Sequence, residues 1–309
     1  MIAYLIRRLG LAVVVLWGVL TLSYGLAALA PGDVAEAMVG QHADVQTLAA
    51  IRTRLGMDRD PLTRYFLYMG SIARGDWGIS SRYQEPVWTL ILARFPRTAQ
   101  LALSALLFAT VLGIVLGVIA AVFRGTWIDR AISYLSLAGI SAPVFWIGLL
   151  LIWILSLQFR LLPPAGYEEG NYRYLVLPAL ALGLRSLALI TRITRAVLLE
   201  IGGMHFIRTA WAKGLAPTVV YGKHALRNAA LPILTVVGLD LGSYLSGSVL
   251  TEKVFGWPGI GRLMVEAILA RDTALINACV AFMAGLFVLV NLAIDLAYGV
   301  FDPRTRQSK

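Results

Sequence analysis

The side chains that most often carry chemistry are few in this chain, and they are scattered along it. The three histidines, His42, His205 and His224, form no H-E-x-x-H or similar metal-binding pattern. The single cysteine, Cys279, can form neither an intrachain disulfide nor a thiolate metal cluster. We therefore expect no metal site and no redox chemistry.

The sequence also lacks the residue patterns that a serine hydrolase or a nucleotide-binding site needs. A serine hydrolase needs a G-x-S-x-G-like turn and a nearby base, and Ser243 with its neighbouring serines has no histidine in the same or any other apolar run. A P-loop needs a Gly-Lys pair. The only such pair, Gly222-Lys223, is followed by His224, and Pro217 stands where the first glycine would be. We expect the chain not to be an enzyme, and any ATP to be bound by another chain.

The composition indicates a membrane protein. The chain has 309 residues, of which 59% are hydrophobic and 14% charged, against roughly 25% charged residues in soluble domains. A helix crosses the hydrocarbon core in about 20 apolar residues. We predict an all-α integral membrane protein, a single domain over residues 1–309. Its expected transmembrane helices, about six in number, are 9–30, 98–123, 131–159, 175–191, 229–250 and 274–300.

The charges in the loops predict the orientation. Lys and Arg number 27 against 17 Asp and Glu, a net charge of +10, and short cytoplasmic loops carry an excess of Lys and Arg. With six spans, both termini and the basic loop 192–228 are cytoplasmic, and 31–97 is an extracytoplasmic loop. Five spans would put 192–228 outside, against this bias. The net charge thus indicates orientation in a membrane and not binding of nucleic acid.

The first span has an alternative interpretation. Arg7-Arg8 followed by an apolar run that ends in small residues at 28–30 is also typical of a signal peptide. The apolar run is longer than the roughly 7 to 15 residues usual for such a peptide. We therefore expect 9–30 to be retained as a helix.

Two loops show helical periodicity. In 31–97, apolar spacing predicts two short amphipathic helices at the outer surface, around Leu48 to Leu55 and around Tyr65 to Ile72, with a partly ordered loop as the alternative. Residues 204–215 predict a third, cytoplasmic helix. Its shared apolar face holds Ile207, Ala210, Trp211, Gly214 and Leu215. Periodicity alone leaves open whether this helix lies on lipid or docks into a partner.

Two charged residues, Arg185 and Asp240, fall inside expected spans. Such residues are costly in a membrane and are usually paired or functional. They could pair with each other, or Asp240 could face a water-filled path and attract a cationic group. Small residues at four-residue spacing, Gly113 with Gly117 and Gly238 with Gly242, predict close approach of helices.

Several segments resemble the permease subunits of binding-protein-dependent ABC importers, in particular the B-type subunit of the dipeptide/oligopeptide/nickel branch. The similarity covers nearly the whole chain. The matching segments are Tyr4-Leu5-Ile6-Arg7-Arg8-Leu9, Leu29-Ala30-Pro31-Gly32-Asp33, Gly75-Asp76-Trp77-Gly78, Phe206-Ile207-Arg208-Thr209-Ala210-Trp211-Ala212-Lys213-Gly214-Leu215, His224-Ala225-Leu226-Arg227-Asn228-Ala229-Ala230-Leu231-Pro232, Thr251-Glu252-Lys253-Val254-Phe255-Gly256-Trp257-Pro258-Gly259-Ile260-Gly261 and Phe301-Asp302-Pro303-Arg304.

The resemblance implies a type I (MetI-like) transmembrane domain in the bacterial plasma membrane. It implies that 192–228 holds a coupling loop that docks in a cleft of an ATPase subunit. The coupling residues would be Phe206, Ile207, Arg208, Thr209, Ala210, Trp211, Lys213, Gly214 and Leu215. The candidates for the translocation pathway and its gate are Asp240, Ser243, Glu252, Phe255, Trp257 and Arg185.

The resemblance also implies partners and cargo. The partners would be a homologous second permease, two ABC ATPases that hold ATP and Mg²⁺, and an extracytoplasmic binding protein that delivers di- or oligopeptides. Nickel, glutathione or another small solute is the alternative cargo, and a passive channel or membrane scaffold is the alternative class. His205, Trp211, Lys253 and Asp240 depart from the family pattern. Lys253 and Asp240 lie nearer the translocation side and could tune the substrate.

Overall fold

The computed structural model describes residues 2–29 and 59–301, and its regular elements there are helices. The predicted all-α class is confirmed. The elements are α1 (Ile2–Leu29), α4 (Pro61–Ala73), α5 (Val87–Val122), α6 (Trp127–Ser141), α7 (Val144–Leu151), the π-helix η1 (Ile152–Gln158), α8 (Arg173–Ile201), α9 (His205–Ala212), α10 (Pro217–Val219), the π-helix η2 (Val220–Ala225), α11 (Leu226–Leu245), α12 (Val249–Val254), α13 (Ile260–Leu269) and α14 (Thr273–Phe301).

The chain divides into two compact units. Unit 1 combines Met1–Pro96 with Pro258–Leu286, and unit 2 combines Arg97–Trp257 with Phe287–Lys309. The two long helices α5 and α14 each contribute residues to both units. Each unit has its own buried apolar clusters, and unit 2 contains all of the predicted coupling and pathway residues.

Five helices in the described part of the chain are long and apolar enough to cross a membrane. They are Ile6–Leu26, Val87–Val122, Arg173–Ile201, Leu226–Leu245 and Thr273–Leu296. The expected span 175–191 lies within α8, which continues in both directions beyond it. Arg185 does not interrupt α8, because its side chain is exposed and not in the helix's buried face.

The expected span 131–159 is not one straight helix. It is a pair, α6 followed by α7 and η1, bent by 110°. The bend lies at Ala142 and Pro143, which both have extended backbone. A proline has no N–H to continue the helical hydrogen bonds, and it disfavours helical geometry in the residue before it. If the bent pair is one span, the number of spans is six, as expected from the sequence.

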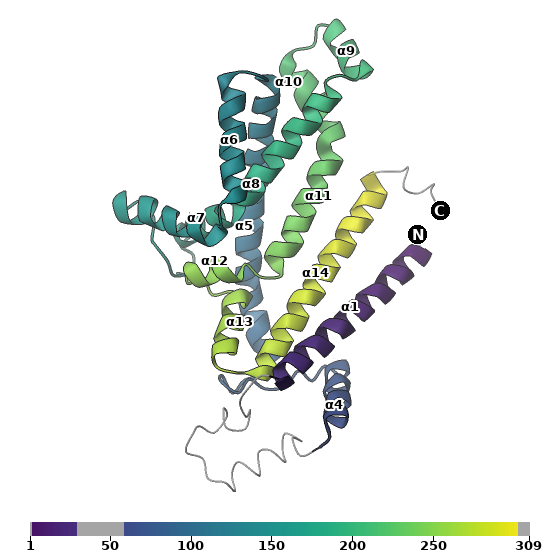
Figure 1. The fold of residues 1–309 in the computed structure, drawn as a ribbon, viewed down its shortest axis with the longest axis vertical. Coiled ribbons are helices and arrows are strands. Elements are labelled where there is room, and N and C mark those ends of the chain that lie inside the picture. The colour runs from purple at the N-terminus through teal and green to yellow at the C-terminus, as the bar shows by residue number, and fades with distance from the viewer. Residues whose placement is uncertain (1, 30–58, 302–309) are drawn as a thin grey trace. The chain divides into compact units, whose positions relative to one another are not determined.

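Helix α8 is the centre of unit 2, where it packs against α6, α7 and α11 (Figure 1). Glycines allow α5 to approach it closely. A Cβ at Gly113 would lie 2.9 Å from Ile190 Cγ2, and one at Gly117 would lie 2.8 Å from the carbonyl oxygen of Thr191. Gly238 and Gly242 of α11 are similarly close to side chains of α14. The close approach predicted for both glycine pairs is confirmed.

In unit 1, α4 is the second amphipathic helix predicted in the outer loop. Asp60 caps it by accepting a hydrogen bond from the backbone N–H of Thr63 at 3.0 Å, and Pro61 occupies the first helical position. Hydrogen bonds from the side chain and then the backbone N–H of Thr63 lower the pKa of Asp60. The first predicted helix, around Leu48 to Leu55, lies outside the described residues.

The segment that follows α4 is fastened to the segment around α13, also within unit 1. Ser80 Oγ donates to Asp272 Oδ2 at 2.5 Å, and the Tyr83 hydroxyl donates to Glu266 Oε2 at 2.8 Å. Burial of Glu266 raises its pKa, but the hydrogen bonds from Tyr83 and Arg262 outweigh burial and leave that pKa below its ordinary value. This part of the predicted loop 31–97 is therefore folded and held by side-chain hydrogen bonds.

The Gly117→Ala substitution tests the packing of α5 on α8. An added methyl would meet the backbone of α8, which cannot move aside, so we expect destabilisation by about 1–3 kcal/mol. Gly18→Ala in α1 is the matched control, because a Cβ there has nothing within 4 Å. The control should keep or raise the midpoint of thermal unfolding in detergent, since alanine favours helix. A Gly117→Ala midpoint as high as that of the control would contradict this packing.

Candidate functional site

The predicted coupling segment forms a short helix at the end of α8. Helix α8 ends at Ile201, two glycines follow, and α9 begins at His205 (Figure 1). The helix is shorter than the predicted 204–215, and α10, η2 and α11 follow it without a long loop. The segment is therefore held between the two helices that carry it, α8 and α11.

Gly214 ends α9 with a turn that few other residues could make. Its φ of +71° lies in the left-handed region. Gly214 N–H donates to the Trp211 carbonyl at 2.9 Å, and Leu215 N–H donates to the Ala210 carbonyl at 3.4 Å. This is the Schellman pattern, which satisfies the last carbonyls of a helix and favours glycine at the left-handed position. The chain reverses here toward α10.

One side of α9 is anchored in the core of unit 2. Ile207 and Ala210 are 2% and 6% exposed, and they belong to a cluster with residues of α8 and α11 such as Leu198 and Ile233. Leu215 packs against the same cluster. These residues were predicted to form a free apolar stripe for lipid or a partner, but much of that stripe is buried within the chain itself.

The other side of α9 faces outward. Phe206 and Trp211 are each 42% exposed, and the Trp211 ring lies edge-on to Tyr221 with centroids 6.2 Å apart. The further exposed members of the predicted coupling set are Arg208, Thr209, Lys213 and Gly214. Aromatic and arginine side chains on a rigid support are typical of protein interfaces. This face, made by Phe206, Arg208, Thr209, Trp211 and Lys213, is called the α9 outer face below.

Three gate candidates, Glu252, Phe255 and Trp257, lie together around α12 and are buried. Glu252 is fully buried, and Thr98 Oγ1 of α5 donates to its Oε1 at 2.9 Å. Trp257 Nε1 donates to the carbonyl oxygen of Arg97 at 2.8 Å. These contacts fasten the turn after α12 to α5. In this structure the three residues are structural members of unit 2 and do not face an open path.

The turn after α12 has the same hydrogen-bond pattern and left-handed glycine as the turn that ends α9. Gly256 has a φ of +64°, and Trp257 N–H donates to the Glu252 carbonyl at 2.9 Å. Phe255, 2% exposed, packs in a cluster with Leu177 of α8. Its carbonyl accepts a hydrogen bond from Gly166 N–H at 2.7 Å. The turn is thus held from α5, from α8 and from the loop before α8.

A small cavity of about 150 Å³ adjoins this turn. The Arg97 guanidinium lies 4.5 Å from the centroid of the Tyr167 ring, and it pairs with Glu169 at 3.0 Å. Tyr167 in turn packs edge-on against Trp257, with centroids 5.1 Å apart. The single arginine that lines the cavity is already engaged by an aromatic ring and a carboxylate, and a second carboxylate of the lining, Glu168, accepts a hydrogen bond from Asn171.

The other candidates lie along α8 and α11. Arg185 and Ser243 are exposed, and Asp240 is half-buried. Among the described residues, no ion pair joins Asp240 to Arg185, and Asp240 Oδ2 is buried without a hydrogen-bond partner. Mutual pairing, one of the two interpretations, is therefore absent here. One turn further along, the Tyr244 hydroxyl bonds with Ser186 and donates to the Leu182 carbonyl at 2.9 Å.

Sequence reasoning missed an ion pair that joins α6 to α8. Arg195 Nε and Nη2 bind the two carboxylate oxygens of Asp129 at 2.6 and 2.8 Å. Arg195 falls in the loop 192–228 that was predicted to be cytoplasmic, but its pairing with Asp129 depends on helix packing that spacing cannot reveal. In residues 2–29 and 59–301, no group of three or more His, Cys, Asp or Glu side chains could hold a metal ion.

Comparison with known proteins gives matches over nearly all of the chain. The family model described as binding-protein-dependent transport system inner membrane component matches residues 113–307. The model of the N-terminal part of such membrane components matches residues 1–102. Together the two matches include every element that carries a candidate residue.

Curated relatives match from end to end. The chain is 40% identical to the di/tripeptide transport system permease protein DppB of Pseudomonas aeruginosa (strain UCBPP-PA14), and 38% identical to the dipeptide transport system permease protein DppB of Escherichia coli (strain K12), with all of each chain covered. It is 36% identical to the glutathione transport system permease protein GsiC of Escherichia coli (strain K12), over 99% of each chain.

A solved structure shares the fold. It shows the MetNI methionine ABC transporter in an inward-facing conformation, and one of its chains aligns with a TM-score of 0.57 and 20% identity. The alignment covers 71% of this chain and 99% of that chain. At this identity the likeness concerns the fold, and it confirms the MetI-like type predicted from the sequence.

The buried hydrogen bond between Thr98 and Glu252 can be tested by Thr98→Val. Valine keeps the shape of threonine and removes the donor, so Glu252 loses a partner in a fully buried place. We expect a cost of about 1–3 kcal/mol in stability, measured as a lower thermal midpoint in detergent. Thr126→Val is the control, because the Thr126 hydroxyl makes its hydrogen bond at an exposed turn. Equal midpoints for the two variants would show that the Glu252 contact does not hold α12 to α5.

Proposed function

The chain belongs to the family of binding-protein-dependent transport system inner membrane components, and we propose that it forms one half of the translocation pathway of an ATP-driven peptide importer. Members of this family are permease subunits of ABC importers, and the chain is a multi-pass protein of the bacterial inner membrane. The observation that carries the proposal is the α9 outer face, which is exposed on a helix whose other side is anchored in the core.

The α9 helix is suited to transmit movement from an ATPase subunit. Ile207 and Ala210 pack against residues of α8 and α11, while Trp211 and Arg208 remain available to a partner. Since packed interiors resist deformation, a push on the α9 outer face would displace the ends of α8 and α11 as a rigid body. Rigid displacement of spanning helices is one way in which a transporter alternates between inward and outward access.

The proposed assembly has several further subunits. A homologous second permease would complete the pathway, and two ABC ATPases would each hold ATP and Mg²⁺. An extracytoplasmic binding protein would deliver the cargo. In this assembly the chain has no catalytic residue, and its role is to couple ATP hydrolysis elsewhere to passage of the cargo. The family match supports partners of these kinds.

Short peptides are the cargo that we propose. Two relatives are named for dipeptides or di- and tripeptides, and a third is named for glutathione. Glutathione is itself a tripeptide, so all three names describe a short peptidic solute. Glutathione is therefore the second candidate, and nickel has no comparable support among these relatives.

Asp240 is the pathway residue for which the geometry offers most support. Its Oδ2 is buried and without a hydrogen-bond partner, and a carboxylate inside a membrane is costly even with Ser186 and Arg185 nearby. The amino terminus of a peptide could satisfy it during passage, while the exposed guanidinium of Arg185 could attract the peptide's carboxyl terminus. Ser243 lies exposed one turn further along α11. For Glu252, Phe255 and Trp257 we propose a gate that opens only when the turn after α12 moves.

The role of Asp240 predicts a dependence on its charge. Asp240→Asn keeps the size of the side chain and removes the charge that would attract an amino group. We expect uptake of unmodified dipeptides by cells that express the full importer to fall several-fold. Asp240→Glu, which retains the charge, should keep most of the uptake. Wild-type uptake by Asp240→Asn, at equal amounts of protein in the membrane, would exclude Asp240 from the pathway.

The role of the α9 outer face predicts that Trp211→Ala uncouples the permease from its ATPase. Interface tryptophans commonly contribute about 2 kcal/mol or more when truncated, so ATPase association should weaken by roughly tenfold or more. Co-purification of the ATPase subunits with the tagged chain measures this. Trp127→Ala is the matched control, because Trp127 is 76% exposed at the start of α6 and lies outside the α9 outer face. Equal recovery of ATPase with both variants would contradict the proposed docking.

A further inference from the structure

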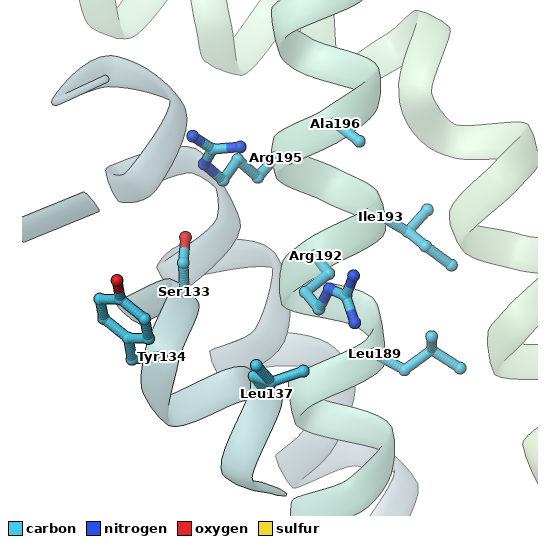
Figure 2. A pocket seen from close by; sticks show the side chains of 8 residues that line it. All are labelled: Ser133, Tyr134, Leu137, Leu189, Arg192, Ile193, Arg195 and Ala196. Atoms are coloured by element: carbon cyan, nitrogen blue, oxygen red, sulfur yellow. The ribbon is translucent and has the colours of Figure 1, made fainter. Parts of the chain in front are cut away.

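A groove between α6 and α8 has no part in the functions described above. Its volume is about 590 Å³. Figure 2 shows the side chains that line it, with Ser133, Tyr134 and Leu137 from α6 and Leu189, Arg192 and Arg195 from α8. The groove lies within unit 2, between two helices that pack directly against each other.

One end of the groove is polar and positively charged. The two arginines there differ, because Arg195 is neutralised by its two bonds to Asp129. The Arg192 side chain is exposed, and within residues 2–29 and 59–301 it makes no hydrogen bond or ion pair. Ser133 adds a hydroxyl at the same level, next to Asp129. This end therefore presents the uncompensated positive charge of Arg192, while the Ser133 hydroxyl already donates to Asp129 Oδ1 at 3.4 Å.

The other end of the groove is apolar. The Asp129–Arg195 ion pair joins α6 and α8 at one level. Further along the two helices they approach closely, since a Cβ added at Gly139 would lie 3.2 Å from Ala188 Cβ. Leu137 and Leu189 lie toward this second level, and Leu137 is 52% exposed. Because α6 and α8 belong to predicted spans, the apolar end lies deeper in the membrane and the arginines lie nearer its surface.

We propose that this groove binds an anionic phospholipid, with its phosphate on Arg192 and its acyl chains along Leu137 and Leu189. Basic pockets between spanning helices near the cytoplasmic surface are suited to phospholipid headgroups. A lipid with one net negative charge would balance the charge of Arg192. The arrangement of one charged end and one apolar end matches the two parts of a phospholipid.

The surroundings of the groove favour lipid over a hydrophilic cargo. On α6, Tyr134 and Leu135 are 71% and 73% exposed. An apolar face with a tyrosine near the surface is typical of helices that contact the bilayer, whereas a peptide pathway would be polar. The inference rests on the membrane location of the chain and is independent of the cargo or of docking by an ATPase.

Native mass spectrometry of the tagged chain, purified with its associated subunits from bilayers of equal phosphatidylglycerol and phosphatidylcholine, tests the proposal. We expect the wild type to retain phosphatidylglycerol in preference to phosphatidylcholine, and Arg192→Gln to lower the retained phosphatidylglycerol several-fold. Arg124→Gln is the matched control, since Arg124 is exposed between α5 and α6 but does not line the groove. The control should retain lipid as the wild type does.

A competition experiment separates lipid from free phosphate as the ligand. Glycerol phosphate carries the same charged group without acyl chains, and it should not displace the bound lipid. Displacement by glycerol phosphate would overturn the proposal, because the phosphate group alone would then be the ligand. Equal retention of phosphatidylglycerol by Arg192→Gln and Arg124→Gln, or no preference for it in the wild type, would also overturn it. Transport measurements play no part in these outcomes.

Discussion

The packing of Ile207 and Ala210 into the core of unit 2 is the interaction on which the proposed coupling depends. Both side chains are almost fully buried in the cluster that joins α8 to α11. Burial of one face fixes which residues of α9 face outward, and the left-handed turn at Gly214 returns the chain toward α11. Without this anchor, the α9 outer face would be a mobile loop and could transmit no force to the membrane.

Helix α8 is fixed at several levels along its length. Its close approach to α5 depends on Gly113 and Gly117, and the Asp129–Arg195 pair ties it to α6. At the level of α12, Phe255 packs against it. Because interiors of this kind are close-packed, displacement of one end is expected to move the helix as a body. Asp240 Oδ2 is one of four buried side-chain oxygens without a hydrogen-bond partner in the described residues, and the only one of them that belongs to a carboxylate.

The sequence predicted the elements well where composition alone determines them. Long uncharged runs indicate spanning helices because the bilayer requires them. Gly214 was placed on the apolar face of a helix over 204–215, whereas its left-handed turn follows the end of α9 at Ala212. The break at Pro143 was missed because the run stays apolar across it. Glu252 was predicted to belong to a gate, but the sequence could not reveal its buried partner Thr98, which is 154 positions away. Contacts between segments far apart in the sequence depend on how the helices pack, and the spacing of residues within one segment does not predict them.

The most direct test of the central claim is purification of the tagged wild-type chain from its native membrane in mild detergent, followed by assay of ATPase activity in whatever co-purifies. The proposed function predicts recovery of a second permease and of ABC ATPase subunits, with ATPase activity that rises when the binding protein and a dipeptide are added. Recovery of this chain alone or only with further copies of itself, in a detergent that keeps a known importer intact, would contradict the claim and favour a channel or scaffold.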